Sequence, residues 1–434
     1  MGFGLTGYIP FVVYIGLVVV LLAVIFHDVR YGIYGMVPIL PYRSIYESVQ
    51  AYPLGKDLID LIILGMLIGG LVRKKEPLQW TNAYIPVGFL FITTFAGVLN
   101  GMANIPSSTS FFADSRLHDW KNYMVMTILF VIILNNIRNV ADIRKVILIL
   151  LLVVTAQALQ WTRSNRFRSH EHFSYDVRDA GSFVFLGPNH LASFFVEYML
   201  LALGIFWIVK KDRLLKYLCG FCFFISVYPV LFLYSRGAYV GLAIGLLMFA
   251  MFRARILIPV MLVPMIFWQT ILPTPVVERI GMAMKGGSEY ENVGNREAIW
   301  KMGEDVFAGN VIFGIGYRTF QFMTGEGELK DTHNMYLSVA AEMGVIGFAV
   351  FVGILLYAAR SGLVLYLRAV DPLLKALGIG FFISTISVAA MNLFGDRWSY
   401  IMMQGFYWVF WGLVERGLII SKDAIQPDKL AEAA

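Results

Sequence analysis

Arginine and histidine side chains stand at the ends of several apolar segments of this 434-residue chain. Arg236 opens one such segment, and His333 directly precedes another. An arginine within a membrane costs about 2.5–3.5 kcal/mol, and less near an interface, so its position needs a reason. A guanidinium group pairs with phosphate oxygens through two hydrogen bonds, and histidine exchanges protons near neutral pH. These residues could therefore bind a phosphorylated ligand and move a proton.

The composition places these residues in a membrane protein. Hydrophobic residues make up 58% of the chain and charged residues 15%. Several apolar runs approach or exceed the ~18–20 residues that cross a bilayer as a helix. A water-soluble protein with this balance would expose more apolar surface than soluble proteins tolerate. We therefore expect an all-α polytopic membrane protein with about twelve transmembrane helices.

The expected spans are apolar runs bounded by charged residues, glycine and proline. They cover residues 8–26, 58–72, 83–99, 121–137, 143–160, 187–209, 214–234, 237–252, 255–272, 334–358, 374–394 and 399–420. The apolar stretch 31–46 is broken by Pro38 and Pro41, which favours a re-entrant or interfacial segment. A thirteenth span there would instead reverse the side on which the N-terminus lies. The first run lacks a basic flank and a small-residue cleavage site, so we expect a retained span and no signal peptide.

Short loops rich in lysine and arginine predict the orientation. Basic clusters within 73–75, 138–145, 210–216, 253–255 and 360–375 fall on one side, which should be the cytoplasm. Residues 1–272 then hold about ten transmembrane helices and an external loop near 161–186. A large periplasmic loop at 273–333, the last two or three transmembrane helices at 334–420 and a disordered cytoplasmic tail at 421–434 follow.

Two of the four polar stretches expected at the outer face surround Asn189 and Arg236. The stretch 178–195 reads RDAGSFVFLGPNHLASFF, in which Asn189 could simply begin a helix. In the stretch 234–247, Gly237, Gly241 and Gly245 recur every four residues and predict a smooth helix face for close packing. Packing does not explain the charge of Arg236.

The other two stretches surround Arg296 and His333. The stretch 294–320 begins as a partly amphipathic helix with Arg296 in its first turn, where a cation opposes the helix dipole. Arg318 follows a glycine-rich turn in the same stretch. The stretch 332–348 reads THNMYLSVAAEMGVIGF and contains His333, Asn334 and Tyr336. Each arginine alone could be a solvated loop residue, and a lone interfacial histidine is usually without function, so the hypothesis depends on the whole set.

Together, the four stretches resemble the O-antigen ligase and polymerase superfamily. The similarity lies in SRG before a glycine-spaced helix, R-x-x-G-x-F…PN-x-x-A, NR-x-x-x-W…G-x-G and HN-x-Y-L…E-x-G-x-x-G, over roughly residues 178–348. The resemblance implies a lipid-dependent glycosyltransferase (GT-C-like) helical bundle with a large, partly helical periplasmic loop in the bacterial inner membrane. Members transfer a glycan from undecaprenyl diphosphate to lipid A-core, to a growing polysaccharide or, in a related branch, to protein.

The resemblance also implies roles for individual residues. His333 would be the catalytic residue, and Arg236, Arg296 and Arg178 would bind the diphosphate. Asn334, Asn189, Tyr336 and Arg318 would support them. The chemistry agrees, because a sugar hydroxyl that attacks an anomeric carbon must lose a proton, and a positioned base contributes ~10²–10⁴ in rate. Arginines fixed near the leaving diphosphate would stabilise its growing charge.

Missing motifs predict that no metal, nucleotide or other cofactor takes part. The chain has neither a D-x-D motif nor a phosphate-binding G-x-x-x-x-G-K-[ST] loop. His170, Glu171 and His172 have poor spacing for zinc, and we expect Cys219 and Cys222 to be small buried residues. The expected partners are a lipid-linked glycan donor, a lipid A-core or glycan acceptor and membrane lipids, with no nucleic acid.

Two alternatives remain open. A polymerase of the same superfamily would use a second lipid-linked glycan as acceptor, and the sequence hardly separates it from a ligase. A transporter would need charged or broken helices in mid-membrane, for which Glu197, Pro229 and Pro264 are the hints. No inverted repeat is visible in the sequence, and transport would leave His333 and the arginines unexplained.

Overall fold

The computed structural model describes residues 8–73, 78–106, 110–166, 171–180, 187–284, 291–323 and 332–432. Every regular element in these ranges is a helix, which confirms the all-α prediction. Seven of the described helices are long and apolar enough to cross a membrane, so the chain is a multi-pass membrane protein. That number does not confirm the expected twelve.

The longer helices coincide with the apolar segments of the sequence. They are α1 (Ile9–Phe26), α4 (Leu58–Arg73), α5 (Tyr84–Asn104), α6 (Ser115–Asn136), α7 (Val140–Asn165), α9 (Pro188–Ile208), α10 (Arg213–Phe232), α11 (Arg236–Phe252), α16 (Met335–Arg368), α17 (Pro372–Met391) and α18 (Ile401–Glu432). The expected span 255–272 differs, because it is divided into α12 (Leu257–Ile266) and α13 (Trp268–Ile271). We predicted disorder after residue 420, but α18 continues to Glu432, since extending an existing helix is easier than starting one.

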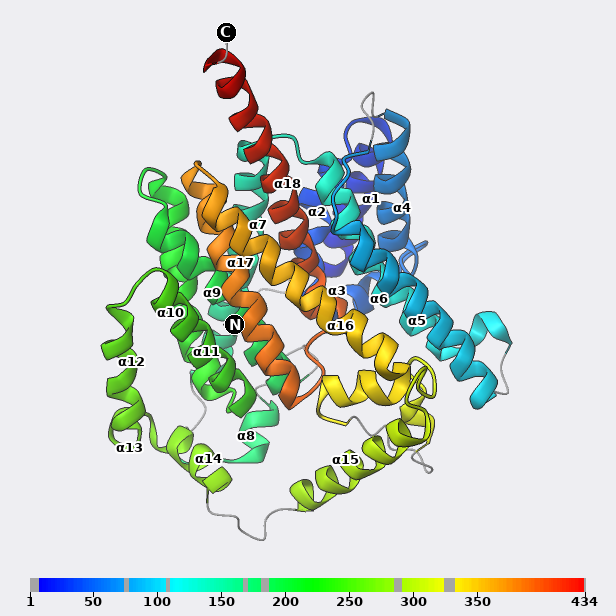
Figure 1. The fold of residues 1–434 in the computed structure, drawn as a ribbon, viewed down its shortest axis with the longest axis vertical. Helices are drawn as coiled ribbons and strands as arrows, with labels where there is room; N and C mark the ends of the chain where they lie inside the picture. The colour runs from blue at the N-terminus through cyan, green and yellow to red at the C-terminus, as the bar shows by residue number, and fades with distance from the viewer. Residues whose placement is uncertain are drawn as a thin grey trace.

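Shorter helices complete the fold. Near the N-terminus are α2 (Arg30–Gly35), η2 (Val37–Ile39) and α3 (Arg43–Val49), and η3 (Phe111–Ala113) precedes α6. The polar segments contain α8 (Tyr175–Ala180), α14 (Thr274–Met284), α15 (Glu291–Gly309) and η4 (Phe320–Phe322), and η5 (Asn392–Phe394) follows α17. Figure 1 shows α8, α14 and α15 gathered at the end of the bundle opposite the C-terminus.

The centre of the bundle is formed by α9 and α17. The most apolar windows of these two helices are 89% and 78% buried, whereas that of α1 is only 11% buried and faces outward. Glycines allow the two central backbones to approach, because a Cβ on Gly204 would lie 2.8 Å from the Cα of Gly380. Cys219 and Cys222 are buried free thiols in α10, as expected from the sequence.

The proline-broken stretch after α1 crosses the bundle and does not return to the side from which it came. It starts at Arg30, beyond the C-terminal end of α1, and passes the middle of α1, where a Cβ on Gly35 would meet Val20. It ends beside the N-terminal end of α1, where the ring of Tyr52 stacks on Tyr14 at 4.9 Å. The re-entrant interpretation is therefore wrong for this stretch.

Polar side chains make such a broken crossing possible within the bundle. The break between η2 and α3 frees backbone carbonyls, and Gln157 of α7 donates a hydrogen bond to the carbonyl oxygen of Pro41 at 3.4 Å. Non-helical backbone at membrane depth is tolerated where protein groups satisfy it in this way. The sequence alone could not reveal this because Gln157 and Pro41 are far apart along the chain.

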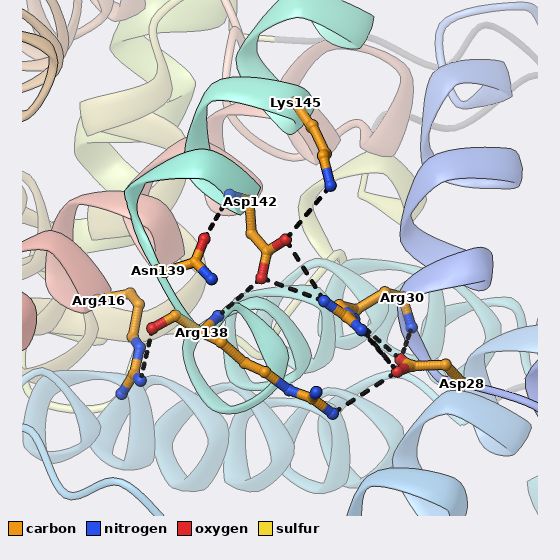
Figure 2. A network of polar contacts seen from close by, with 7 residues as sticks. All are labelled: Asp28, Arg30, Arg138, Asn139, Asp142, Lys145 and Arg416. Carbon is orange, nitrogen blue, oxygen red and sulfur yellow. Dashed lines mark hydrogen bonds and ion pairs between the residues drawn. The ribbon is translucent and has the colours of Figure 1, made fainter.

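An ionic network fixes the start of this crossing to the loop between α6 and α7 (Figure 2). Arg30 lies between two carboxylates, 2.9 Å from Asp28 and 3.3 Å from the buried Asp142. Arg138 approaches Asp28 at 3.6 Å, and Lys145 approaches Asp142 at 3.9 Å. Because Arg138 and Lys145 belong to the clusters expected in the cytoplasm, the C-terminal end of α1 lies on the expected cytoplasmic side.

This arrangement predicts that the N-terminal end of α1 lies on the outer side. We expect Tyr8→Cys to react with a membrane-impermeant thiol reagent in intact cells, and His27→Cys to react only in inverted vesicles. Both positions are exposed, and the native Cys219 and Cys222 are buried and give little background. A re-entrant segment would produce the opposite labelling pattern.

Candidate functional site

The N-terminal end of α11 holds Arg236 as the first residue of the helix. Ser235 caps the helix, and its hydroxyl accepts a hydrogen bond from the amide of Ala238 at 3.4 Å. The glycine face of α11 packs against neighbouring helices as predicted, because Cβ atoms on Gly237 and Gly241 would lie 2.8 Å from Phe394 and 2.4 Å from Met391. Helix packing thus explains the glycines, and Arg236 stands at the end of that packed face.

Arg279 of α14 ties the end of α11 to the segment that carries Arg178. Its guanidinium donates hydrogen bonds to the carbonyl oxygen of Tyr234 at 3.3 Å and to the hydroxyl of Tyr175 at 3.1 Å. It also lies over the ring of Phe173, 4.8 Å from the ring centre. Arg178 belongs to the same short helix as Tyr175. The arginines at 178, 236 and 279 therefore come from elements that contact one another.

The segment 392–400 lies between α17 and α18, near the N-terminal ends of α9 and α11. Phe394 packs against Gly237 at the start of α11. The carboxylate of Asp396 accepts hydrogen bonds from the amides of Trp398 and Ser399, both at 2.9 Å. The carbonyl oxygen of Arg397 accepts a hydrogen bond from Gln404 at 2.7 Å. The segment is thus a rigid turn and carries one acid and one arginine.

His333 immediately precedes α16 and is held by its neighbours. Asn334 caps α16, and its side-chain oxygen accepts a hydrogen bond from the amide of Tyr336 at 3.0 Å. The hydroxyl of Thr332 donates to the carbonyl oxygen of Asn334 at 2.8 Å, and Trp300 of α15 donates to the carbonyl oxygen of Thr332 at 2.7 Å. These bonds fix the backbone on both sides of the imidazole.

A second histidine, His190, lies near His333. Its ring packs edge-on against Tyr400 at 5.4 Å and is within electrostatic reach of His333, Asp396 and Arg397. Its Nε2 atom is buried without a hydrogen-bond partner. We had selected the preceding residue, Asn189, from the sequence and missed His190. The only sequence signal was its position in the motif PN-x-x-A, which gives no information about what it faces.

Arg318 is held by acidic groups and differs in this respect from a free phosphate-binding cation. Its guanidinium lies 3.5 Å from Asp396, and its backbone amide donates to Glu342 at 3.0 Å. Burial would raise the pKa of Asp396, but the charge of Arg318 and the amides of Trp398 and Ser399 outweigh it and lower that pKa below its ordinary value. Arg318 and Asp396 therefore form a charged pair whose net charge is close to zero.

Backbone strain is concentrated in this region. Among the described residues, Leu54, Tyr234, Arg318 and His333 are the non-glycine residues with left-handed φ, between 52° and 59°. Such conformations are unfavourable for most side chains and persist where the surroundings enforce them, often at functional sites. Three of the four flank or belong to the predicted site. The surrounding structure thus positions Arg318 and His333 at a conformational cost.

The positions of the remaining predicted residues say less about their roles. The backbone of Arg296 is part of α15, and the structure does not describe its side chain. The backbone carbonyl oxygen of Asn189 accepts a hydrogen bond from the hydroxyl of Ser193 at 2.8 Å, and the hydroxyl of Tyr336 donates to the carbonyl oxygen of Ala389 at 2.8 Å.

The described residues contain no group of three or more His, Cys, Asp or Glu side chains suited to a metal ion. His172 instead bonds to Glu278 of α14 at 2.7 Å, which raises the pKa of its imidazole above the ordinary value. His170 lies outside the described residues.

Comparison with known families gives one result, over residues 221–352. This part of the chain matches the family model described as O-antigen ligase. The resemblance to the O-antigen ligase superfamily is confirmed. Among curated proteins, no sequence matches the chain.

The part of the chain that matches this family model includes Arg236, Arg296, Arg318 and His333. Arg178, His190 and Asp396 lie outside the match and approach it through the folded structure. The family match supports a ligase- or polymerase-type function with lipid-linked glycan substrates in a membrane setting.

Proposed function

We propose that this protein is a metal-independent glycosyltransferase of the O-antigen ligase type at the periplasmic face of the bacterial inner membrane. It transfers a glycan from undecaprenyl diphosphate to a sugar hydroxyl of lipid A-core. His333 is the general base, and Arg236, Arg296 and Arg178 hold the diphosphate. Asn334 supports His333 as the cap of α16.

One observation carries this proposal: the outer ends of α9, α11 and α16 converge on the segment 392–400. His190 of α9 lies beside Asp396, and Phe394 packs against Gly237 of α11. His333, at the start of α16, is within electrostatic reach of His190. The convergence brings imidazole groups and arginines to one end of a membrane bundle, as expected for a reaction between a lipid diphosphate and a sugar hydroxyl.

In the proposed reaction, the imidazole of His333 and the arginines have separate tasks. The acceptor hydroxyl oxygen forms a bond to the anomeric carbon of the donor while the bond from that carbon to the phosphate oxygen breaks. The hydroxyl proton passes to the imidazole of His333, and the electron pair of the broken bond leaves with undecaprenyl diphosphate. Arginines that already face the diphosphate would stabilise its extra charge without rearranging. The glycan–diphosphate bond supplies the driving force.

The test is transfer by purified protein in nanodiscs, with a glycan on undecaprenyl diphosphate as donor. Lipid A-core is offered in one reaction and a second lipid-linked glycan in another. We expect a glycan-extended lipid A-core product. Chain growth on the second donor alone would identify a polymerase, and transfer to neither acceptor would contradict both functions.

The same assay tests the predicted independence from metal. We expect the transfer rate in excess EDTA to equal the rate in magnesium, because arginines take the role that a cation would have at the diphosphate. Activity that disappears in EDTA and returns with magnesium or manganese would contradict this prediction.

A further inference from the structure

A cavity of about 190 Å³ opens beside the proposed catalytic residues. It is enclosed by α5, α6 and α16 together with the loops around residues 318 and 396. Thr332, the residue that directly precedes His333, forms part of the wall of the cavity. Pockets for drug-sized ligands usually measure about 300–1,000 Å³, so this one suits a single ring of a larger substrate.

The wall of the cavity combines aromatic and polar side chains. The rings of Tyr123 and Tyr317 lie nearly parallel, 6.2 Å apart and inclined by 26°. Arg318, Ser338 and Asp396 contribute charged or hydroxyl groups to the same wall. A sugar ring needs both kinds of neighbour, since its C–H face is apolar and its edge carries hydroxyls. The cavity therefore matches a sugar better than a lipid chain.

The charges of the cavity disfavour a diphosphate. Among the residues that line the cavity, Arg318 is the cation. Asp396 and Glu342 contribute two carboxyl groups. Asp119 lies close enough for the charge of Arg318 to act on it as well. An anion would compete with Asp396 for the charge of Arg318, which is the cationic side chain among the lining residues, whereas the outer end of α11 is rich in arginine. A neutral sugar meets no such opposition.

Two of the side chains that line the cavity, Arg318 and Tyr123, carry hydrogen-bond donors. The Nε atom of Arg318 is buried and has no hydrogen-bond partner, although its neighbouring guanidinium nitrogen pairs with Asp396. An unsatisfied buried donor is unfavourable and calls for an explanation. The hydroxyl of Tyr123 accepts a hydrogen bond from Trp398 at 2.5 Å, which leaves its own proton for another acceptor. Both donors fit the oxygens of a sugar.

We propose that this cavity is a binding subsite for one neutral sugar ring of the glycan substrates. The ring packs on Tyr123 and Tyr317, and its oxygens accept hydrogen bonds from Arg318 and Tyr123. This inference rests on the proposed function, and it separates the site into an arginine-rich part for the diphosphate and a nearly neutral part for sugar. The ring belongs to either the donor or the acceptor, and the experiment distinguishes them.

The first test fills the cavity. Val339 is buried in its wall on α16, and Val339→Phe places an aromatic ring in the space. Val345→Phe is the matched control, because Val345 lies on the same helix and is 48% exposed. We expect Val339→Phe to raise the KM for the substrate that supplies the ring by roughly tenfold or more. The control should behave as the unchanged protein.

A second variant guards against misfolding. Arg318→Lys keeps the positive charge beside Asp396 but removes the Nε donor, so the fold should survive while the KM for the same substrate rises by roughly threefold to tenfold. A rise in the acceptor KM assigns the ring to the acceptor. Weaker binding of the lipid-linked glycan, with bare undecaprenyl diphosphate unaffected, assigns it to the donor.

The results also separate this inference from the proposed function. Unchanged protein that binds neither lipid diphosphate nor glycan would contradict the function itself. The sugar subsite alone would be overturned if the wild-type protein transfers glycan normally and both Val339→Phe and Arg318→Lys have the same KM and binding values as Val345→Phe.

Discussion

His333→Asn is expected to reduce single-turnover glycan transfer by about 10²–10⁴-fold, the typical contribution of a general base. Binding of the lipid-linked donor should change by no more than about twofold, because the proposed diphosphate ligands are arginines. Asparagine is the informative substitution here. His333 has a left-handed φ of 53°, which asparagine tolerates better than most residues, so the backbone before α16 should be retained. Donor binding and transfer should be measured on the same nanodisc preparation.

Two further variants identify the cause of any loss. His333→Ala removes the imidazole as well but tolerates the backbone conformation less, so a larger loss of stability than in His333→Asn would measure the conformational contribution. His27→Asn changes an exposed histidine at the opposite end of the bundle and should be silent. A His333→Asn protein with a near-normal single-turnover rate would end the general-base assignment. Lost donor binding would instead make His333 a phosphate ligand.

The sequence predicted the helices well because hydropathy and length determine whether a segment can cross a membrane. It also predicted the packed face of α11, since glycine spacing is a local property that the contacts of Gly237 and Gly241 confirm. The broken crossing at 30–49 could not be resolved in this way. Its direction depends on tertiary contacts, such as those of Arg30 with Asp142 and of Gln157 with Pro41.

The candidate site was likewise predictable from the sequence only in part. Residue type and order were enough to propose roles for His333 and Arg236, but not to separate Arg318 from the arginines proposed to bind the diphosphate. That distinction comes from Asp396 and Glu342, which are 78 and 24 residues away in the sequence. His190 was missed for the same reason, because its neighbours belong to the segment 392–400. The role of Arg296 stays a prediction.

Arg236→Lys should lower both donor affinity and turnover, although it preserves the charge. The diphosphate is charged before the reaction and gains charge during it, so a group that binds it acts on both states. Lysine presents a point charge and cannot reproduce the two parallel hydrogen bonds of a guanidinium. Arg236 is also the first residue of α11, where a cation opposes the helix dipole by about 0.3–1 kcal/mol. Helix stability therefore does not explain its presence.

The position of Arg236 makes this experiment selective. Arg236→Gln removes the charge from the start of α11, and donor binding should fall further than in Arg236→Lys. Arg253→Lys is the matched control, since Arg253 caps the other end of the same helix, on the expected cytoplasmic side. Binding of undecaprenyl diphosphate and transfer should be measured for all three at equal membrane abundance. An Arg236→Lys protein that equals Arg253→Lys in both measurements would rule out a specific diphosphate clamp at α11, and the anion would then have to be sought at Arg178 and Arg296.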